Sequence, residues 1–162
     1  MNSSSRFVVA THILAGMHCA QNLQGVSSVT SDFIAEGVNT NPVVIRRLLG
    51  QLRKAGLVDS QAGSKGGFSL AKSTDQIALL DVYRATEEGS LFHFHYTEPN
   101  QACPVGCTIQ DSLKDICSEA ESAVESVLAK QTISMLVEDM MANPVFREKA
   151  EEAMAAGIAP GS

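Results

Sequence analysis

The sequence predicts a mainly α-helical fold with one small β-hairpin and one long helix towards the C-terminus. Three observations indicate this fold. Apolar side chains recur at helical spacing in several stretches, a short alternating segment turns back at a glycine-rich run, and an apolar stripe extends over about five helical turns after residue 108. The chain has 162 residues, of which 44% are hydrophobic and 19% charged, so it can bury a core as one domain with an appendage.

Two helices are predicted near the N-terminus. Apolar side chains recur at helical spacing from residue 4 to about residue 21, which predicts an amphipathic helix; they are Phe7, Ala10, Leu14 and Met17. Residues 26–29 suffice only for a short strand or turn. Thr30 or Ser31 can cap a short second helix, and Gly37 is suited to its C-terminal end.

A third helix is predicted to begin at Pro42, because Asn41 is a favoured N-cap residue and proline is favoured at the first helical position. It runs to about Ala55 and has two faces. Its apolar face holds Val44, Ile45, Leu48, Leu49 and Leu52, and its other face holds Arg46, Arg47, Gln51, Arg53 and Lys54. For this helix taken alone, a solvated basic face on a core helix is the alternative interpretation.

The order of these elements favours a role in binding DNA. A short helix, a tight turn and a basic-faced helix form the helix-turn-helix arrangement, which places its second helix in the major groove. A β-hairpin follows, with alternating residues 58–62 and 68–70 joined by the turn 63–67. Such a hairpin is a wing, and Ser64 and Lys65 at its tip can contact phosphate or the minor groove. The turn lacks the spacing of a P-loop, so nucleotide binding is not predicted.

The net charge of −6 conceals a difference between the two halves of the chain. Residues 1–75 contain 7 lysines and arginines against 4 acidic residues, whereas residues 76–162 contain 5 against 14. The first half can contact phosphate, and the acidic second half is suited to facing away from DNA. No apolar stretch approaches the roughly 18 residues that span a bilayer, and the N-terminus lacks the features of a secretory signal. We therefore expect a cytoplasmic protein that does not associate with membranes.

The second half is predicted to contain the long helix. Its apolar stripe spans residues 109–128, with the acidic residues mainly outside the stripe. A helix of this length needs a packing partner, either a second copy of the chain or the rest of the same chain. A shorter apolar set precedes Pro144 and is expected to fold back on the first half or on the partner; it consists of Ile133, Leu136, Val137 and Met140.

Four stretches carry a resemblance to a known family. They are residues 41–47 (NPVVIRR), 52–58 (LRKAGLV), 63–71 (GSKGGFSLA) and 77–85 (IALLDVYRA). Through them the chain resembles the Rrf-two family of winged-helix transcriptional regulators over roughly residues 5–142. The resemblance implies a homodimeric, sequence-specific repressor that binds double-stranded DNA at a pseudo-palindromic operator and is not an enzyme.

The resemblance also implies how the chain is divided. Residues 1–86 correspond to a winged helix-turn-helix DNA-binding domain, 87–107 to a cysteine-containing sensor loop, 108–142 to dimerisation helices and 143–162 to an Ala/Gly-rich tail. The implied DNA-binding residues lie at the start of the second helix, along the third helix and at the wing tip; they are Thr30, Ser31, Asn41, Val43, Arg46, Arg47, Gln51, Lys54, Ser64 and Lys65. For Thr30 and Ser31, simple capping of the second helix is an equally good interpretation.

Four cysteines, at positions 19, 103, 107 and 117, indicate a metal or redox role more than a structural disulfide in a cytoplasmic protein. Cys103, Cys107 and Cys117 stand where some members of the family carry the thiolate ligands of an iron–sulfur cluster. The gaps of three and nine residues between them depart from the spacing in those members. Cys117 also lies on the apolar stripe, where a buried inert thiol is common.

The run Cys103-Pro104-Val105-Gly106 resembles instead a subgroup of the family in which a cysteine before the long helix is open to oxidation. The nearby helix N-terminus would lower the pKa of Cys103, and Cys107, or Cys19 across subunits, could form a disulfide with it. We therefore favour thiol oxidation as the signal. A metal or iron–sulfur cluster on the three C-terminal cysteines is one alternative, and the absence of any cofactor or cysteine function is the other.

His93 and His95 would share one face of a strand and could form a metal-ligand pair, but without a nearby CxxC motif a structural segment is the favoured interpretation. Two further functions compete with DNA binding. A thiol or metal enzyme could use cysteine and histidine as a nucleophile pair, yet no third orienting residue is evident. A winged helix used only for protein contacts would leave the basic helix and Lys65 without a role.

Overall fold

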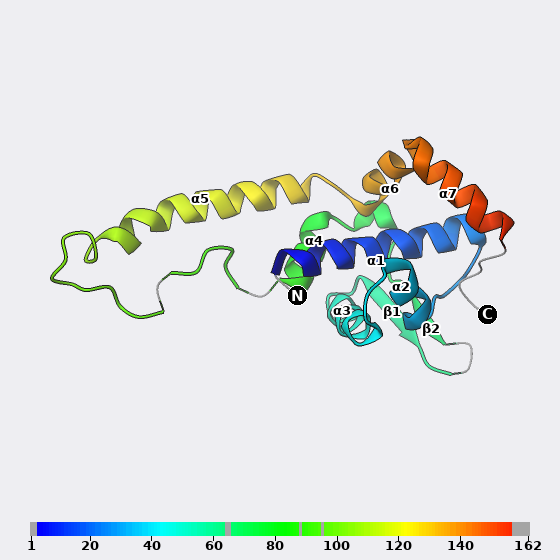
Figure 1. Cartoon of the computed structure of the whole chain (residues 1–162), viewed down its shortest axis with the longest axis horizontal. Coiled ribbons are helices and arrows are strands. Elements are labelled where there is room, and N and C mark those ends of the chain that lie inside the picture. The colour runs from blue at the N-terminus through cyan, green and yellow to red at the C-terminus, as the bar shows by residue number, and fades with distance from the viewer. Residues whose placement is uncertain (1–2, 64–65, 88, 95, 157–162) are drawn as a thin grey trace.

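The structure is a computed structural model and describes residues 3–63, 66–87, 89–94 and 96–156. Its elements are α1 (Ser3–Gln24), α2 (Ser31–Val38), α3 (Pro42–Lys54), β1 (Val58–Gln61), β2 (Gly67–Leu70), a 3-10 turn η1 (Thr74–Gln76), α4 (Leu79–Thr86), α5 (Ile109–Ala129), α6 (Ile133–Ala142) and α7 (Pro144–Ala155). We call α5 and the described part of residues 89–108 the arm, and the other elements the head (Figure 1). The predicted mainly helical fold with a β wing and a long helix is confirmed.

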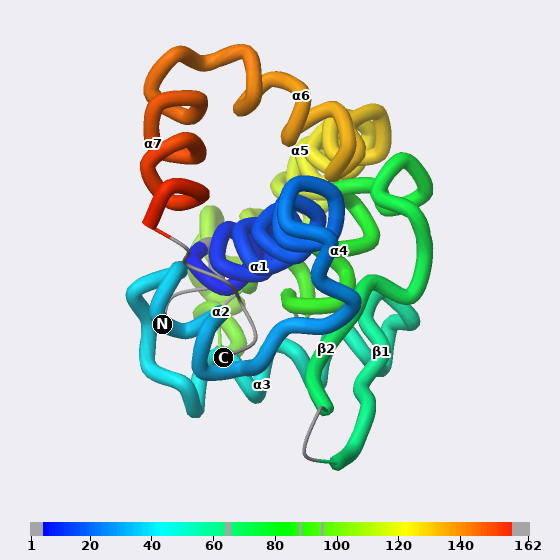
Figure 2. The backbone as a smooth tube through the Cα atoms, turned by 90° about the vertical axis from the view of Figure 1, so that its right-hand side faces the viewer, coloured from blue at the N-terminus to red at the C-terminus, as the bar shows by residue number. Residues whose placement is uncertain are grey.

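Helix α1 runs through the middle of the head, with α6 and α7 on one side and α2, α3 and the strands on the other (Figures 1 and 2). The core side chains come mainly from four helices; they include Ile13, Leu14 and Met17 of α1, Ile45, Leu48, Leu49 and Leu52 of α3, Val82 of α4, and Ile133 and Val137 of α6. The apolar face predicted for the third helix is therefore the face that enters the core. Because α6 takes part, the core draws on both halves of the chain.

Side-chain caps fix where α2 and α3 begin. Thr30 Oγ1 accepts a hydrogen bond from Phe33 N at 3.2 Å, and Asn41 Oδ1 accepts one from Val43 N at 2.9 Å. Each cap satisfies a backbone N–H that has no partner inside its own helix. The helix starts predicted from Thr30 and from the Asn41-Pro42 pair are thus confirmed.

The end of α2 differs from the prediction by two residues. Gly37 lies inside the helix, and the left-handed residue that closes it is Asn39, with φ of 53°. Asn39 N donates to Glu36 O at 3.0 Å and so satisfies a terminal carbonyl. Asparagine adopts this conformation more readily than other residues with a Cβ, so the helix continues one residue past the glycine and stops at Val38.

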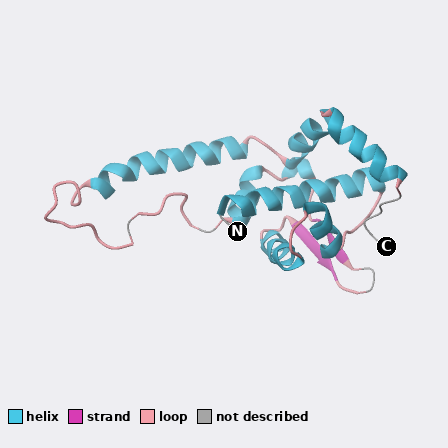
Figure 3. Ribbon diagram, viewed as in Figure 1, coloured by secondary structure: helices cyan, strands magenta, loops and turns pink. Residues whose placement is uncertain are grey.

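The wing is a two-stranded antiparallel sheet with Val58 opposite Leu70 (Figure 3). On its other edge, Phe68 exchanges two backbone hydrogen bonds with Val29, of 2.9 and 2.8 Å. A Cβ at Gly67 would lie 2.8 Å from Val29 O, so only glycine allows this close approach. The wing is therefore attached to the segment that leads into α2.

Beyond α5 the chain returns to the head. Leu79 N donates to Gln131 O at 2.8 Å, and Ile133 N donates to Ile77 O at 3.0 Å. Helix α6 follows, with Ile133 and Val137 buried. The apolar set that precedes Pro144 is expected from the sequence to pack either on the first half of the chain or on a partner. In the structure it packs on the head.

Helix α7 occupies most of the segment that the sequence suggests as an Ala/Gly-rich tail. Asn143 Oδ1 accepts a hydrogen bond from Val145 N at 3.0 Å, and Pro144 is at the first helical position. The helix starts with the same Asn-Pro pair as α3. It packs on α6 but buries none of its residues.

The arm extends away from the head (Figure 1). Helix α5 buries none of its residues and packs against α4 where it meets the head. The described part of residues 89–108 runs outward from the head beside α5 and contains no helix or strand, and α5 leads back to the head. None of the helices among the described residues is long and apolar enough to cross a membrane.

Candidate DNA interface and cysteine loop

The start of α3 is the exposed end of the helix-turn-helix. The Val43 side chain is 67% exposed, and an apolar group at this place can contact the methyl group of thymine. Arg47 is also exposed and has no hydrogen-bond or ion-pair partner in the described part of the chain. Asn41 is exposed beside them, and its Oδ1 accepts the hydrogen bond that caps the helix. These three side chains are free to meet the edges of bases or phosphates.

Arg46 joins the two helices of the helix-turn-helix. Its Nη2 lies 3.3 Å from Asp32 Oδ1, and its Nε donates to Ser31 Oγ at 3.4 Å. Arg46 and Asp32 are both exposed, so these contacts are weak and can be exchanged for contacts with phosphate. The sequence prediction did not include Asp32, because nothing in the sequence shows that it meets Arg46 until the two helices are packed.

The other predicted DNA-binding residues are less close to this end. Gln51 is half-buried, and its Oε1 is shielded from solvent without a partner among the described residues. Lys54 is exposed at the far end of α3, about 18 Å along the axis from its start. Ser64 and Lys65 lie outside the described residues. Thr30 caps α2, which is the role that the sequence indicates as the alternative to contact with DNA.

A contact between α3 and the wing fixes their relative position. Arg53 Nη1 donates to Ser60 Oγ at 3.0 Å, from the last turn of α3 to β1. Together with the Val29–Phe68 bridge, it attaches the wing both to α3 and to the segment before α2. The helix-turn-helix and the wing can thus approach DNA as one unit.

Cys103 lies in a tight turn before α5. The backbone N–H groups of Gly106 and then Val105 donate to its sulfur and lower the pKa of the Cys103 thiol, while burial acts in the opposite direction. The side chain is partly exposed, so reagents in solution can reach the thiolate. The predicted lowering of this pKa agrees with the structure, but its source is the N–H groups of the turn itself.

The shape of this turn depends on Gly106. A Cβ there would lie 2.5 Å from Asn100 O, so no larger residue fits without displacing the backbone. The same carbonyl accepts a hydrogen bond from Cys103 N at 3.0 Å, and Asn100 Oδ1 accepts one from Ala102 N at 2.9 Å. Asn100 thus organises the turn that stabilises the thiolate, a role that no sequence motif indicated.

The other cysteines differ in their surroundings. Cys107 is exposed one turn after Cys103, with its N–H donating to Cys103 O at 3.0 Å. Cys117 is half-buried on α5. Cys19 is half-buried in the head, where burial raises the pKa of its thiol.

The described residues of one chain do not assemble a metal site. Among the described residues, no group of three His, Cys, Asp or Glu side chains is placed to hold a metal ion. Cys103, Cys107 and Cys117 therefore do not form a ligand set for a cluster within one protomer. His93 is exposed in the arm, and His95, the second member of the predicted pair, lies outside the described residues.

Comparisons with known proteins decide the family. The model of the Rrf2 family, described as an iron-dependent transcriptional regulator, matches residues 3–139. A protein of Bacillus subtilis (strain 168) named as an HTH-type transcriptional regulator, YwnA, is 38% identical over 130 residues, which cover 80% of this chain and 92% of that protein. The chain belongs to the Rrf2 family. The Rrf-two family, which the four stretches resemble, is this Rrf2 family.

Solved structures agree with this assignment. A crystal structure described as that of a DNA-binding protein is 36% identical to this Rrf2 chain, with a TM-score of 0.64, and the match covers 81% of this chain and 97% of that one. The IscR protein of T. potens is 26% identical, with a TM-score of 0.55, over 86% of this chain and 85% of its own. The chain is thus a DNA-binding transcriptional regulator and not an enzyme, and the alternative of a thiol or metal enzyme is wrong.

Proposed function

We propose that this Rrf2 protein is a homodimeric, cytoplasmic repressor that binds a pseudo-palindromic operator through α3 and the wing, and that oxidation of Cys103 lowers its affinity for DNA. The observation that carries the dimer is the uncovered apolar stripe of α5. Ile116 is 61% exposed and Val127 63% exposed, and Leu113 and Val124 are exposed along the same stripe. A 21-residue helix that buries nothing in its own chain has this face available for a second copy.

The placement of α3 supports the proposed mode of DNA binding. Dimers of helix-turn-helix proteins place two recognition helices in successive major grooves, which makes their operators pseudo-palindromic. Here the start of α3 presents Val43 for base contact and Arg47 for base or phosphate contact. The acidic residues of the arm are carried away from this surface, which avoids repulsion by DNA.

A salt titration with a matched variant tests this surface. The probe is the duplex that the wild-type protein selects from a pool of randomised sequences, and the readout is fluorescence anisotropy. We expect Arg47→Ala to weaken binding by about tenfold and to reduce the dependence of affinity on salt. Arg147→Ala, which removes an exposed charge from α7, should leave both unchanged. Equal behaviour of the two variants, or binding that does not respond to salt, would contradict this mode of binding.

The proposed switch uses the Cys103 thiolate with a peroxide as oxidant. The thiolate attacks one oxygen of hydrogen peroxide, the O–O bond breaks, and the products are a sulfenic acid and hydroxide. The Cys107 thiolate then attacks Cys103 Sγ, expels a second hydroxide and forms a disulfide. Two thiolates are thereby oxidised and one peroxide is reduced by two electrons. Cys19 of a partner subunit is the alternative resolving thiol.

Peptide mapping without reductant tests the switch. In wild-type protein treated with hydrogen peroxide, we expect a disulfide that includes Cys103 and a fall in DNA affinity of about tenfold or more, reversed by dithiothreitol. Cys103→Ser should keep its affinity under the same treatment, whereas Cys117→Ser should respond as the wild type does. Loss of affinity in Cys103→Ser equal to that of the wild type would rule out Cys103 as the sensor.

We do not expect iron to be the signal for this chain, although its family is described as iron-dependent. The three C-terminal cysteines are not assembled as ligands in one protomer. We expect protein purified without oxygen to be colourless and to contain no stoichiometric iron. A brown protein with visible absorption that is lost in Cys103→Ser would replace the thiol switch with cluster chemistry.

A further inference from the structure

Helix α5 is attached to the head by a carboxylate about one turn before its C-terminal end. Glu125 accepts two hydrogen bonds from the guanidinium of Arg84 in α4, with Nη2 2.7 Å from Oε2 and Nε 3.3 Å from Oε1. This is the two-pronged geometry that gives an arginine–carboxylate pair directional preference. Because α5 buries no residue, such polar contacts contribute much to its direction relative to the head.

A second carboxylate one turn earlier holds the start of the cysteine loop. Glu121 Oε1 accepts hydrogen bonds from the Ser90 hydroxyl, from Leu91 N at 2.7 Å and from Phe92 N at 3.3 Å. The Ser90 hydroxyl, followed by Phe92 N–H, lowers the pKa of Glu121, with burial opposing. The carboxylate therefore stays charged, and keeps its partners, at neutral pH.

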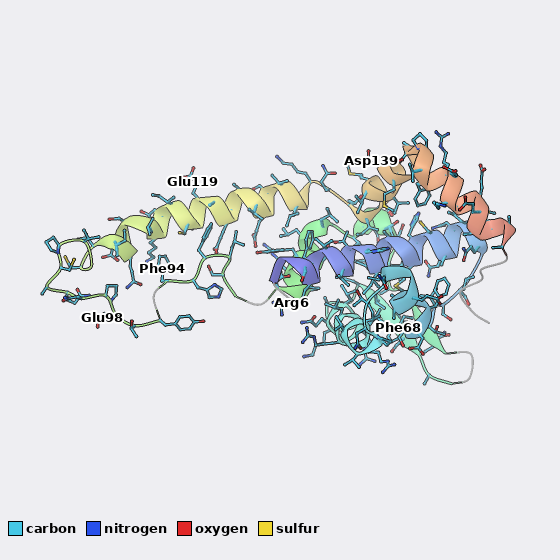
Figure 4. All side chains as sticks on the ribbon, viewed as in Figure 1. Arg6, Phe68, Phe94, Glu98, Glu119 and Asp139 are labelled. Carbon is cyan, nitrogen blue, oxygen red and sulfur yellow. The ribbon has the colours of Figure 1, made fainter. Side chains whose placement is uncertain are left out.

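The two carboxylates lie at the edge of the apolar stripe, away from its most exposed residues. At 100° per residue, Glu121 lies about 20° round the axis from Leu128 but about 140° from Ile116, and Glu125 lies about 180° from Ile116. A second copy of the chain that covers Ile116 and Val127, which are 61% and 63% exposed, can therefore leave both carboxylates with their partners. Figure 4 shows Glu119 on the side of α5 turned away from the loop, which makes it a control for charge changes.

Helix α4, which carries Arg84, is itself held to α1. The Tyr83 ring meets the Phe7 ring edge to face, with centroids 5.9 Å apart. The Glu87 carboxylate lies 3.1 Å from Arg6 Nη2 and accepts a hydrogen bond from Phe7 N at 3.2 Å. Helix α4 also packs against α3. A change in the direction of α5 is thus passed to a rigid group of helices that includes the recognition helix.

We propose that Glu121 and Glu125 are positioning residues that set how the arm is mounted on the head. Glu125 fixes the direction of α5 through Arg84, and Glu121 ties the segment that leads to Cys103 to the same part of α5. In a dimer joined along α5, this direction sets the distance between the two α3 helices and hence the half-site spacing that is bound. The inference rests on the proposed dimer and adds a route by which a change in the cysteine loop reaches α3.

A charge exchange tests Glu125. Arg84→Glu should weaken binding to the selected duplex by about tenfold, because it places two carboxylates together and tilts α5. Adding Glu125→Arg should restore the pair and recover affinity to within about threefold of the wild type. It should also restore the preference for the selected duplex over a version with one base pair inserted between the half-sites. A double variant no better than Arg84→Glu would overturn the assignment of Glu125.

Hydrogen exchange tests Glu121. In Glu121→Gln we expect exchange at the amides of Leu91 and Phe92 to rise by about tenfold, with no such rise in Glu119→Gln. In peroxide-treated protein, the difference in DNA affinity between oxidised and reduced forms should shrink in Glu121→Gln and persist in Glu119→Gln. Unchanged exchange at both amides would overturn the assignment of Glu121.

These readouts separate this inference from the proposed function. If the wild-type protein sediments as a monomer, the proposed dimer is wrong. If its affinity for DNA does not change with peroxide, the proposed switch is wrong. Hydrogen exchange at the amides of Leu91 and Phe92 still tests the positioning role of Glu121 in either case, because it is measured on reduced protein without DNA. If the charge exchange fails to rescue binding in a protein that is dimeric and peroxide-sensitive, the positioning role of Glu125 alone is wrong.

Discussion

The interactions that stabilise the head differ from those that attach the arm. The head buries an apolar core in which Leu48 and Leu52 of α3 are fully shielded from solvent. The arm buries nothing on α5 and is attached through hydrogen bonds of Glu121 and Glu125. Burial of apolar surface dominates folding free energy, whereas exposed ion pairs contribute little. The head can therefore be stable by itself, while the direction of the arm remains adjustable.

This difference matches the two tasks that we propose for the molecule, base reading through α3 and regulation through the arm. Reading bases requires side chains held in fixed positions, and the core and the caps provide that at the start of α3. A regulatory element needs states that differ little in free energy, so that a small chemical change can shift the balance. Weak polar attachments and an uncovered apolar stripe meet that need in the arm.

The largest expected effect is in the core of the head. Leu48→Ala should lower the free energy of unfolding by about 2–5 kcal/mol, because it leaves a cavity among well-packed side chains. Val127→Ala, a truncation of an arm residue that is 63% exposed, should change it by less than about 1 kcal/mol in dilute protein. Urea denaturation at low protein concentration measures both. Similar losses for the two variants would show that the arm is as much a part of the folding core as the head.

The next effect concerns assembly. Ile116→Lys places a charge in the middle of the apolar stripe, and we expect it to weaken dimerisation at least about tenfold while leaving the urea midpoint of the isolated chain unchanged. Sedimentation velocity over a range of concentrations measures the first quantity. Lys114→Ala, on the same helix, provides a control with an exposed charge removed. If Ile116→Lys sediments as the wild type does, the stripe is not the dimer surface.

A smaller effect separates two helices that begin alike. Asn41 and Asn143 each cap a helix whose first residue is proline, but α3 is in the core and α7 buries nothing. Asn41→Ala should therefore lower the global free energy of unfolding by about 1 kcal/mol. Asn143→Ala should only increase local exchange of the first amides of α7. Hydrogen exchange with mass spectrometry checks both, and a global loss in Asn143→Ala would show that α7 supports the core.

The parts of the fold that the sequence predicted are those that local rules determine. The apolar faces of α3 and α5, the cap at Asn41 and the glycine-rich wing all depend on residues within a few positions of one another. Helix α7 shows that such a rule was also available for residues 143–156, since Asn143-Pro144 repeats the signal used for α3. The Ala/Gly content of that segment suggested a tail, but its first two residues, a helix N-cap followed by proline, were the better guide to its structure.

The contacts that escaped prediction join residues far apart in the chain. Asp32 meets Arg46 only once α2 packs on α3, and Glu121 meets Ser90 only because residues 89–94 run beside α5. His18 is a further case, since its Nδ1 lies 2.8 Å from Thr74 Oγ1, a partner 56 residues away. Charged and polar residues of this kind have many possible partners, and the sequence alone does not choose among them.

The smallest expected effect compares one thiol of the arm with one of the head. The N–H groups of Gly106 and Val105 lower the pKa of Cys103, whereas burial raises the pKa of Cys19. Because the thiolate is the form that reacts, alkylation of Cys103 by iodoacetamide should begin at lower pH than that of Cys19. Mass spectrometry of each peptide across a pH series measures the two midpoints.

The two thiols also make the free energy of unfolding depend on pH in opposite directions. The stability that the Cys103 thiolate contributes is lost as pH falls through its lowered pKa, whereas the stability that the neutral Cys19 thiol contributes is lost as pH rises through its raised pKa. Replacing Gly106 with alanine should displace the turn and move the Cys103 midpoint upward, with that of Cys19 unchanged, and coincident midpoints in the wild type would contradict a thiolate held by the turn.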